Sequence, residues 1–240
     1  LLVWPVDPAG AGPVSNTLIS EYSRARLVAD RPAVRPGETF EIQLELDTDP
    51  AWHSYWRNPG DSGTATRLDW ELPAGVTAGG LRWPVPERIF LAPLMTYGYE
   101  GPTTLRTTLQ AAADLKPGER LRLRARAEWL ECKEICLPGE GELVLELPVR
   151  ERAGPDSAVV RQPVDSARAR PGPQPLPEGS QVKARLLDDR ILLEVRLPAL
   201  AGVELDQERV YFFIADEGVV AHAEPQPFTL NGDTLRMEVP

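Results

Sequence analysis

Strict alternation of apolar and polar residues is the feature that most restricts how this chain can fold. Between residues 39 and 47 every second side chain is apolar, and the same pattern returns at residues 120–129 and 142–149. Successive side chains of a β-strand point to opposite faces, so this period of two predicts strands with one buried face. Four arginines occupy the outer face of the 120–129 segment.

Prolines and glycines separate these apolar runs. The chain has 25 prolines and 19 glycines, spread throughout its length, as expected of many short strands joined by turns. Further strand candidates lie at residues 24–28, 67–72 and 103–109. We therefore predict an immunoglobulin-like β-sandwich domain over residues 1–150, with Pro138 and Gly139 supplying a hairpin turn between its last two strands.

A proline-rich stretch over residues 151–177 interrupts the pattern and is interpreted as an extended linker. Strand patterns resume at residues 181–187, 190–197, 209–215, 219–223 and 234–239, with Asp188 and Asp189 as a hairpin turn. The predicted fold class is all-β, with two immunoglobulin-like β-sandwich domains joined by this linker. The second, smaller β domain, residues 178–240, is expected to be a truncated one and to act as a spacer or docking unit.

Charge and hydropathy exclude several functions. The net charge is −10 and the basic residues are scattered, so the chain lacks the basic patch that nucleic-acid binding requires. No run of about 18 apolar residues is present to cross a bilayer. The start, Leu1-Leu-Val-Trp-Pro, is too short for a signal peptide and would suit a mature or trimmed secreted chain.

Cys132 and Cys136 are the only cysteines in the chain. Helix residues four apart hold their Cβ atoms roughly 6 Å apart, whereas a disulfide needs about 3.5 to 4.5 Å, so a bonded pair must lie in a turn. The ring would be very short and would remove little entropy from the unfolded chain, which makes a purely structural role poorly motivated. A small ring at a hairpin tip would be accessible and easily reduced, which favours reversible redox exchange.

Three other interpretations of the pair remain: a structural disulfide, part of a metal site, and two unreactive thiols. A metal site is poorly supported because only His53 and His222 could complete it, and neither forms a ligand-spaced cluster with the cysteines. We predict neither metal nor cofactor. His53 could act as a general base, but it lies far from the cysteines in sequence, so a packed or surface histidine is the favoured interpretation. Residues 58–63 are interpreted as a tight turn.

Several motifs, taken in order, resemble a known family. They are Ala-Trp-His-Ser-Tyr-Trp-Arg-Asn-Pro-Gly-Asp-Ser-Gly at 51–63, Trp-Glu-Leu-Pro at 70–73, Leu-Arg-Trp-Pro-Val-Pro at 81–86, Thr-Tyr-Gly-Tyr-Glu at 96–100, and Glu-Trp-Leu-Glu-Cys-Lys-Glu-Ile-Cys-Leu-Pro at 128–138. Together they resemble the N-terminal periplasmic region of DsbD-like thiol:disulfide interchange proteins, in particular the ScsB-type suppressor of copper sensitivity branch.

The resemblance implies a protein-disulfide reductase, the soluble periplasmic part of an inner-membrane protein whose transmembrane domain lies outside these residues. A thioredoxin-like domain of the same full-length polypeptide would supply electrons, and thioredoxin-fold periplasmic proteins would be the substrates. Two alternatives stay open: a non-catalytic binding or assembly module with a permanent disulfide, and a copper-tolerance module whose reduced thiols bind Cu(I).

The resemblance also assigns roles to residues. Cys132 and Cys136 would be the catalytic pair, with Cys136 attacking the partner disulfide and Cys132 resolving the mixed disulfide, although better-known DsbD members space their cysteines more widely. Phe90, within residues 88–94, would belong to a cap over the pair, with an ordinary core phenylalanine as the equally weighted alternative. Tyr97 and Tyr99 would line the site, one of them expected in the core and the other at the surface.

The residues beside the cysteines pull the thiol pKa in opposite directions. Lys133 favours a thiolate, whereas Glu131 and Glu134 oppose one, so we expect no strongly depressed thiol pKa.

Overall fold

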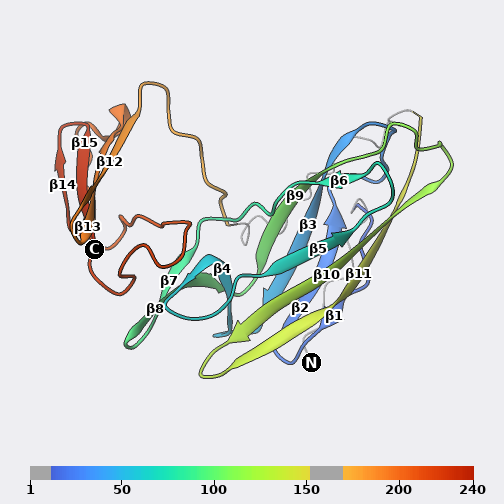
Figure 1. Ribbon diagram of the computed structural model, residues 1–240, viewed down its shortest axis with the longest axis horizontal. Helices are drawn as coiled ribbons and strands as arrows, with labels where there is room; N and C mark the ends of the chain where they lie inside the picture. Colours follow the sequence, from blue (N-terminus) through green and yellow to red (C-terminus); the bar gives the residue numbers. More distant parts are fainter. Residues whose placement is uncertain (1–11, 152–169) are drawn as a thin grey trace.

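The computed structural model describes residues 12–151 and 170–240, and within them the predicted all-β class is confirmed. The described residues form three antiparallel sheets and one short 3-10 helix, η1 (Pro198–Leu200). Two sheets belong to the N-terminal part and one to the C-terminal part (Figure 1).

The first sheet contains five strands in the order β1-β2-β3-β9-β6. The strands are β1 (Leu18–Ile19), β2 (Ser23–Ala29), β3 (Thr39–Thr48), β9 (Thr103–Gln110) and β6 (Thr77–Ala78). The alternation predicted a half-buried strand at residues 39–47, and β3 buries every second side chain over that range.

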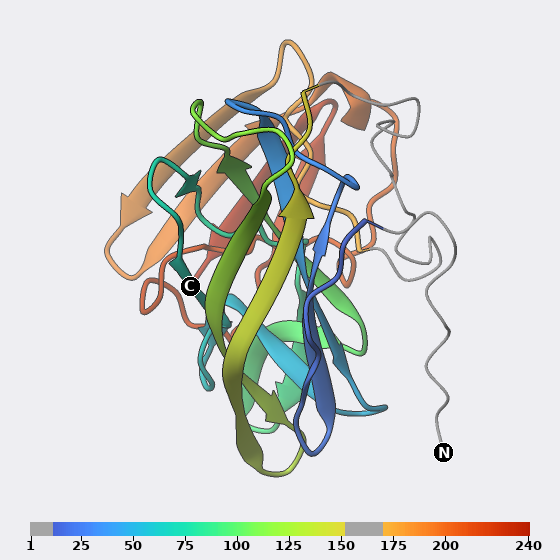
Figure 2. The ribbon, with the colours of Figure 1, turned by 90° about the vertical axis from the view of Figure 1, so that its right-hand side faces the viewer.

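The second sheet follows the order β11-β10-β4-β8-β7, and β5 also pairs with β10. Its strands are β4 (His53–Gly60), β5 (Arg67–Glu71), β7 (Glu87–Leu91), β8 (Leu94–Glu100), β10 (Arg120–Cys132) and β11 (Cys136–Pro148). The long β10–β11 hairpin lies over strands β2 and β3 of the first sheet (Figure 2).

The inner faces of these two sheets share one hydrophobic core. It includes Leu27, Ile42 and Leu44 from the first sheet and Leu123 and Leu145 from the second. All five side chains are almost fully buried, and burying one leucine or isoleucine contributes about 1.5 to 3 kcal/mol. The N-terminal part is therefore a two-layer β-sandwich.

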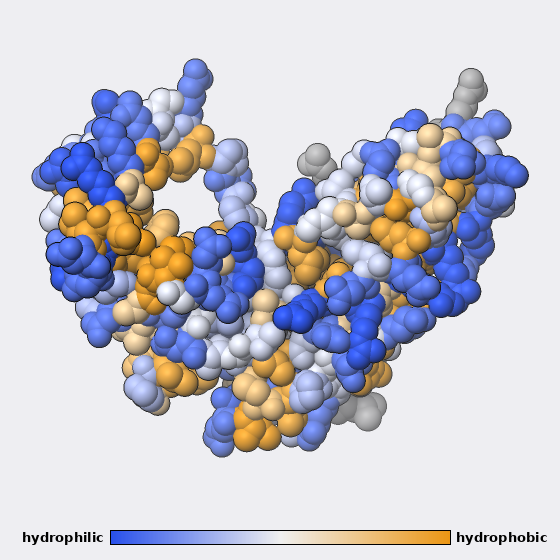
Figure 3. Space-filling model, in the orientation of Figure 1, coloured by the Kyte–Doolittle hydropathy of each residue, from blue (hydrophilic) through white to orange (hydrophobic). Residues whose placement is uncertain are grey.

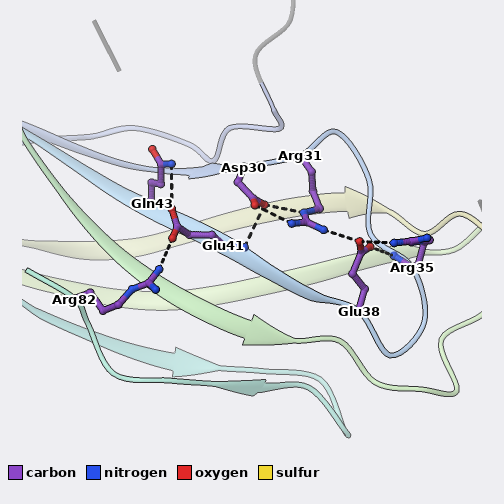
Figure 4. Close-up of polar contacts among 7 residues, drawn as sticks. All are labelled: Asp30, Arg31, Arg35, Glu38, Glu41, Gln43 and Arg82. Carbon is purple, nitrogen blue, oxygen red and sulfur yellow. Dashed lines mark hydrogen bonds and ion pairs between the residues drawn. The ribbon is translucent and has the colours of Figure 1, made fainter. Parts of the chain in front are cut away.

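Ion pairs hold the connection between β2 and β3 (Figure 4). Arg31 bonds Asp30 at 2.8 Å and Glu38 at 2.6 Å, and Arg35 bonds Glu38 at 3.0 Å. Partial burial acts to raise the pKa of Glu38, but hydrogen bonds from Arg35 and the charges of both arginines outweigh it, so this pKa lies below its ordinary value. Nearby, Arg82 and Gln43 both bond the carboxylate of Glu41.

The predicted turn at Pro138 and Gly139 is wrong. Both residues lie inside β11, where Gly139 pairs with Trp129 across the hairpin, and the actual turn comprises residues 133–135. A Cβ atom on Gly139 would come within 2.2 Å of the Trp129 ring. This glycine is required for close approach of an aromatic ring and not for a turn.

The third sheet has the order β12-β13-β15-β14, with β12 (Gln181–Leu187), β13 (Arg190–Arg196), β14 (Phe228–Asn231) and β15 (Thr234–Val239). The predicted hairpin turn at Asp188 and Asp189 is confirmed. The predictions of strands at residues 209–215 and 219–223 are wrong, and β14 was not predicted.

The irregular segment 209–215 nevertheless has two apolar sides. Val210 and Phe212 pack on the third sheet, whereas Tyr211 and Phe213 contact the N-terminal part. The side-chain amide of Gln226 bonds both the N–H and the carbonyl of Phe212, in place of a neighbouring strand. The apolar residues of this segment therefore do alternate between two faces. Its backbone at Phe212, however, is hydrogen-bonded by the Gln226 side chain and not by a neighbouring strand.

The predicted linker is only partly described, because residues 152–169 lie outside the described ranges. Residues 170–177 contain no strand. Arg170 pairs with Glu87 and lies over the ring of Tyr99, and the amide of Val85 donates to the Pro171 carbonyl at 3.1 Å. The start of this segment thus lies against the N-terminal sandwich. The domain boundaries at 150 and 178 stay predictions.

Candidate functional site

A disulfide joins Cys132 and Cys136 at the end of the β10–β11 hairpin, with an S–S distance of 2.07 Å and Cα atoms 4.2 Å apart. The two residues are direct cross-strand partners, closed by the three-residue turn Lys133-Glu134-Ile135. Cys132 is only 1% exposed, whereas Cys136 is exposed. Of the two cysteines, Cys136 is therefore the one that a partner protein can approach from solvent, whereas Cys132 is shielded.

Strand β4 brings two further side chains to the disulfide. His53 is the cross-strand partner of Cys132, and the Tyr55 hydroxyl lies 3.4 Å from the Cys136 sulfur. The His53 and Tyr55 rings meet edge to face, with centroids 5.2 Å apart. The four residues form one continuous cluster, called the disulfide cluster below.

Burial governs the protonation of this cluster. His53 is 2% exposed, and its Nε2 atom is buried with no hydrogen-bond partner among the described residues. Burial lowers the pKa of His53 and so favours the neutral imidazole. Burial raises the pKa of Tyr55, although a hydrogen bond with Ser62 acts in the other direction, so Tyr55 is a neutral phenol at physiological pH.

The loop after β4 holds the Tyr55 ring in place. Gly63 has φ +98°, and a Cβ atom there would lie 2.1 Å from a carbon of that ring. The predicted tight turn at 58–63 is only partly confirmed, because residues 58–60 still belong to β4. The chain turns after Gly60, whose φ is +85°. Glycine at 63 lets the backbone cover the ring directly.

Behind the disulfide, on the core side of β10, lies the fully buried carboxylate of Glu131. It accepts hydrogen bonds from the Ser20 hydroxyl at 2.8 Å, the Tyr22 amide at 3.1 Å and the Ser23 hydroxyl. The Ser23 oxygen in turn accepts from Trp129 Nε1 at 2.8 Å. This network anchors the end of β10 next to Cys132.

The expectation that Tyr97 and Tyr99 divide between core and surface is wrong. Residues two apart on a strand share a face, and both tyrosines are fully buried. Cross-strand partners also share a face: Tyr99 pairs with Ser54, whereas Gly98 pairs with Tyr55. The two tyrosines therefore lie on the sheet face opposite to the disulfide cluster.

Phe90 is 61% exposed near the tip of the β7–β8 hairpin. It pairs with Met95, two residues from Tyr97, which puts it on the face of Tyr97 as well. In this arrangement the side chain does not cover the disulfide, and its role as a cap stays a prediction that requires movement of the hairpin.

The C-terminal part packs against this opposite face. The Tyr97 hydroxyl bonds the Tyr211 hydroxyl at 2.5 Å and His222 Nδ1 at 3.1 Å, and the Phe213 ring contacts both Trp56 and Tyr97 edge to face. Strand β4 thus contributes to the disulfide cluster on one face and contacts the C-terminal part on the other.

Asn58, near the C-terminal end of β4, links this strand to the C-terminal part by hydrogen bonds. Its side-chain amide donates to the carbonyls of Ile214 and Asp216, both at 3.0 Å, and its oxygen accepts from the Gly60 amide at 3.0 Å. Sequence reasoning missed Asn58, Tyr55 and the position of His53. For His53 and Tyr55 the motif at 51–63 was the available signal, since these two residues occupy alternate positions of one strand and so share a face.

Among the described residues, no group of three or more His, Cys, Asp or Glu side chains is placed to hold a metal ion. None of the helices in the described ranges has the length and hydropathy to cross a membrane.

Fold and site together define a β-sandwich domain whose disulfide closes an exposed hairpin tip. The model of the family "Thiol:disulfide interchange protein DsbD, N-terminal" matches residues 24–148, just over half of the chain. The chain belongs to this family and is a thiol:disulfide interchange module of that type.

Among solved structures, the chain is similar to the N-terminal periplasmic domain of ScsB from Proteus mirabilis. The TM-score is 0.57 at 17% sequence identity, and the match covers 95% of this chain and 84% of that chain. A match to the GAE domain of yeast GGA1 has a TM-score of 0.32 at 12% identity, covering 56% of this chain and 98% of that one. No curated protein matches the sequence significantly.

Proposed function

We propose that this chain is a periplasmic protein-disulfide reductase module in which Cys132 and Cys136 pass two electrons to disulfides of partner proteins. The observation that carries the proposal is the asymmetry of the pair, in which an exposed Cys136 is bonded to a buried Cys132 at a hairpin tip. Membership of the DsbD N-terminal family supports both the chemistry and the periplasmic location.

The exposed sulfur would start the reaction. In the reduced domain the Cys136 thiolate attacks one sulfur of the partner disulfide, forms a mixed disulfide and releases the partner's other sulfur as a thiolate. Cys132 then attacks Cys136, the Cys132–Cys136 bond forms, and the partner leaves with the second electron pair on its sulfur. The partner disulfide is reduced and the cysteine pair is oxidised.

Reloading would use the same sulfur in reverse. A thiolate of the reduced donor attacks Cys136, and Cys132 leaves as a thiolate. The donor's second sulfur then attacks the donor sulfur bonded to Cys136, so the donor disulfide forms and Cys136 leaves as a thiolate. A thioredoxin-like domain of the same full-length polypeptide is the proposed donor, and thioredoxin-fold periplasmic proteins are the proposed substrates.

Apolar residues around the tip support docking of a folded partner. Ile135, in the turn between the cysteines, is 60% exposed, and Leu91 and Leu94 at the neighbouring hairpin tip are 38% and 40% exposed. Figure 3 shows apolar residues gathered at both hairpin tips. Exposed apolar clusters of this kind mark protein contact surfaces.

The test is the redox equilibrium of the pair in graded glutathione buffers, measured by alkylation and intact mass. Exchange proteins have potentials between about −270 and −120 mV, whereas structural disulfides lie below about −300 mV. A transition within the first range supports the proposal. A pair that stays oxidised in strongly reducing buffer would instead identify a binding module with a structural disulfide.

Trapping of the mixed disulfide tests the order of attack. Cys132→Ala should accumulate a covalent complex with an oxidised thioredoxin-fold protein, and Cys136→Ala should not, because its remaining sulfur is buried. The reverse result would exchange the two roles.

A further inference from the structure

We propose that His53 is the general base that removes the proton from the Cys132 thiol when Cys132 resolves the mixed disulfide. The inference rests on the proposed function and deepens it, because it separates the chemistry of the buried sulfur from that of the exposed one.

The position of His53 is the first argument. Directly opposite residues of neighbouring antiparallel strands hold their Cβ atoms about 4.5 to 5.5 Å apart on one face of the sheet, and His53 is directly opposite Cys132. The contact of Tyr55 with both the His53 ring and the Cys136 sulfur confirms that β4 presents this face to the disulfide.

The unpaired nitrogen is the second argument. Buried polar atoms almost always have a hydrogen-bond partner, and an unpaired one costs about 1 to 3 kcal/mol. His53 Nε2 is buried and unpaired in the oxidised protein, in which Cys132, the residue directly opposite His53, is bonded in the disulfide and carries no thiol proton. Reduction would create a thiol at Cys132, and this thiol supplies the missing partner.

A buried thiol needs such a base. The thiolate is the attacking species, and burial of Cys132 disfavours it, so water is a poor acceptor for this proton. A histidine whose pKa is lowered by burial stays neutral at pH 7 and can accept it.

The other ionisable groups described around His53 do not compete with it for the Cys132 proton. Glu100, its cross-strand partner on β8, is exposed, and Glu131 on β10 is bonded on the core side by three donors. Lys133 and Glu134 lie exposed in the hairpin turn. Tyr55, on the same strand, is a neutral phenol and does not compete for the proton.

The step balances as follows. The proton of the Cys132 thiol passes to His53 Nε2 while its sulfur electron pair forms the bond to Cys136. The bond between Cys136 and the partner sulfur breaks, and the partner departs as a thiolate. The imidazolium then releases its proton to that thiolate or to water.

Reaction of the reduced full chain with dithiobis(nitrobenzoate) resolves the two sulfurs. Attack by Cys136 releases a first thionitrobenzoate, and resolution by Cys132 releases a second, so stopped-flow absorbance shows two phases. His53→Gln should slow the second phase about 100-fold, the lower end of general-base effects, and leave the first unchanged. His222→Gln, at the other histidine, should change neither phase.

The pH profile separates a base from a merely structural residue. The second phase of the unaltered protein should be flat from about pH 7 to 8 and fall at lower pH, as His53 becomes protonated. In His53→Gln it should rise about tenfold per pH unit, because the thiolate must then form without the help of a neighbouring base.

An unchanged second phase in folded His53→Gln would overturn the inference. If that variant does not fold, a second phase of the unaltered protein that rises tenfold per pH unit would overturn it equally. A first phase that is absent in the unaltered protein would refute the proposed function itself, so the two failures are distinguishable.

Discussion

Replacing Glu131 by alanine should destabilise the fold, whereas the same change at Glu128 on the same strand should not. Glu131 is fully buried at the end of β10 and is the common acceptor for three donors. Glu128 lies three residues earlier on the outer face, where it pairs with Arg126 across an exposed surface. The two glutamates therefore form a matched comparison within one strand.

The expected magnitude follows from the donors left without an acceptor. The Ser23 hydroxyl is buried, and an unsatisfied buried donor costs about 1 to 3 kcal/mol. The Ser20 hydroxyl and the Tyr22 amide belong to half-buried residues and can turn partly to water, so each adds a smaller cost. We expect a loss of about 2 to 4 kcal/mol for Glu131→Ala and less than about 0.5 kcal/mol for Glu128→Ala.

Urea denaturation of the oxidised protein, followed by tryptophan fluorescence, measures both free energies of unfolding. A thermal scan should agree, with roughly 2 to 4 °C lost per kcal/mol for a chain of this size. A loss of less than 1 kcal/mol for Glu131→Ala, or equal losses for the two variants, would refute the assignment of Glu131 as the anchor of the hairpin end.

Three further predictions concern packing, the contact between the two parts, and pH. Gly139→Ala should cost about 1 to 3 kcal/mol in urea denaturation because its Cβ would overlap the Trp129 ring, whereas Gly80→Ala, with open space around it, should cost less than about 0.5 kcal/mol; equal costs would contradict the packing argument. Asn58→Ala removes both hydrogen bonds to the C-terminal part, so hydrogen exchange in residues 208–222 should become faster by about 10-fold, a loss near 1.4 kcal/mol, and unchanged exchange would argue against this contact. Because the pKa of Glu38 is lowered in the folded state, its stabilisation is complete above the ordinary value of 4.5 and is lost as pH falls through the lower, folded-state pKa. Glu38→Gln should therefore flatten the acid side of a stability–pH profile, and a profile parallel to that of the unaltered protein would disprove this contribution.

The strands with regular alternation could be predicted from sequence because a half-buried strand encodes its two faces locally. Strand β3 and the β10–β11 hairpin are of this kind. Strand β4 was not predicted, since both of its faces are covered and its residues show no period of two: His53, Ser54, Tyr55 and Trp56 are all buried. The prediction of a strand at 209–215 was wrong for the opposite reason: the segment does alternate, but its alternation reflects packing against two surfaces and not membership of a sheet.

The sequence by itself determined the all-β class and singled out Cys132 and Cys136, because period-two patterning and two close cysteines are local properties of the chain. Only the tertiary structure decided which of the two cysteines is exposed and which residues accompany the pair. His53 and Tyr55 lie some 80 residues before the cysteines and reach them because β4 pairs with the end of β10. Such long-range pairing is set by the shared core and the packing of the C-terminal part on the reverse face, and neither is encoded in the spacing of any one motif.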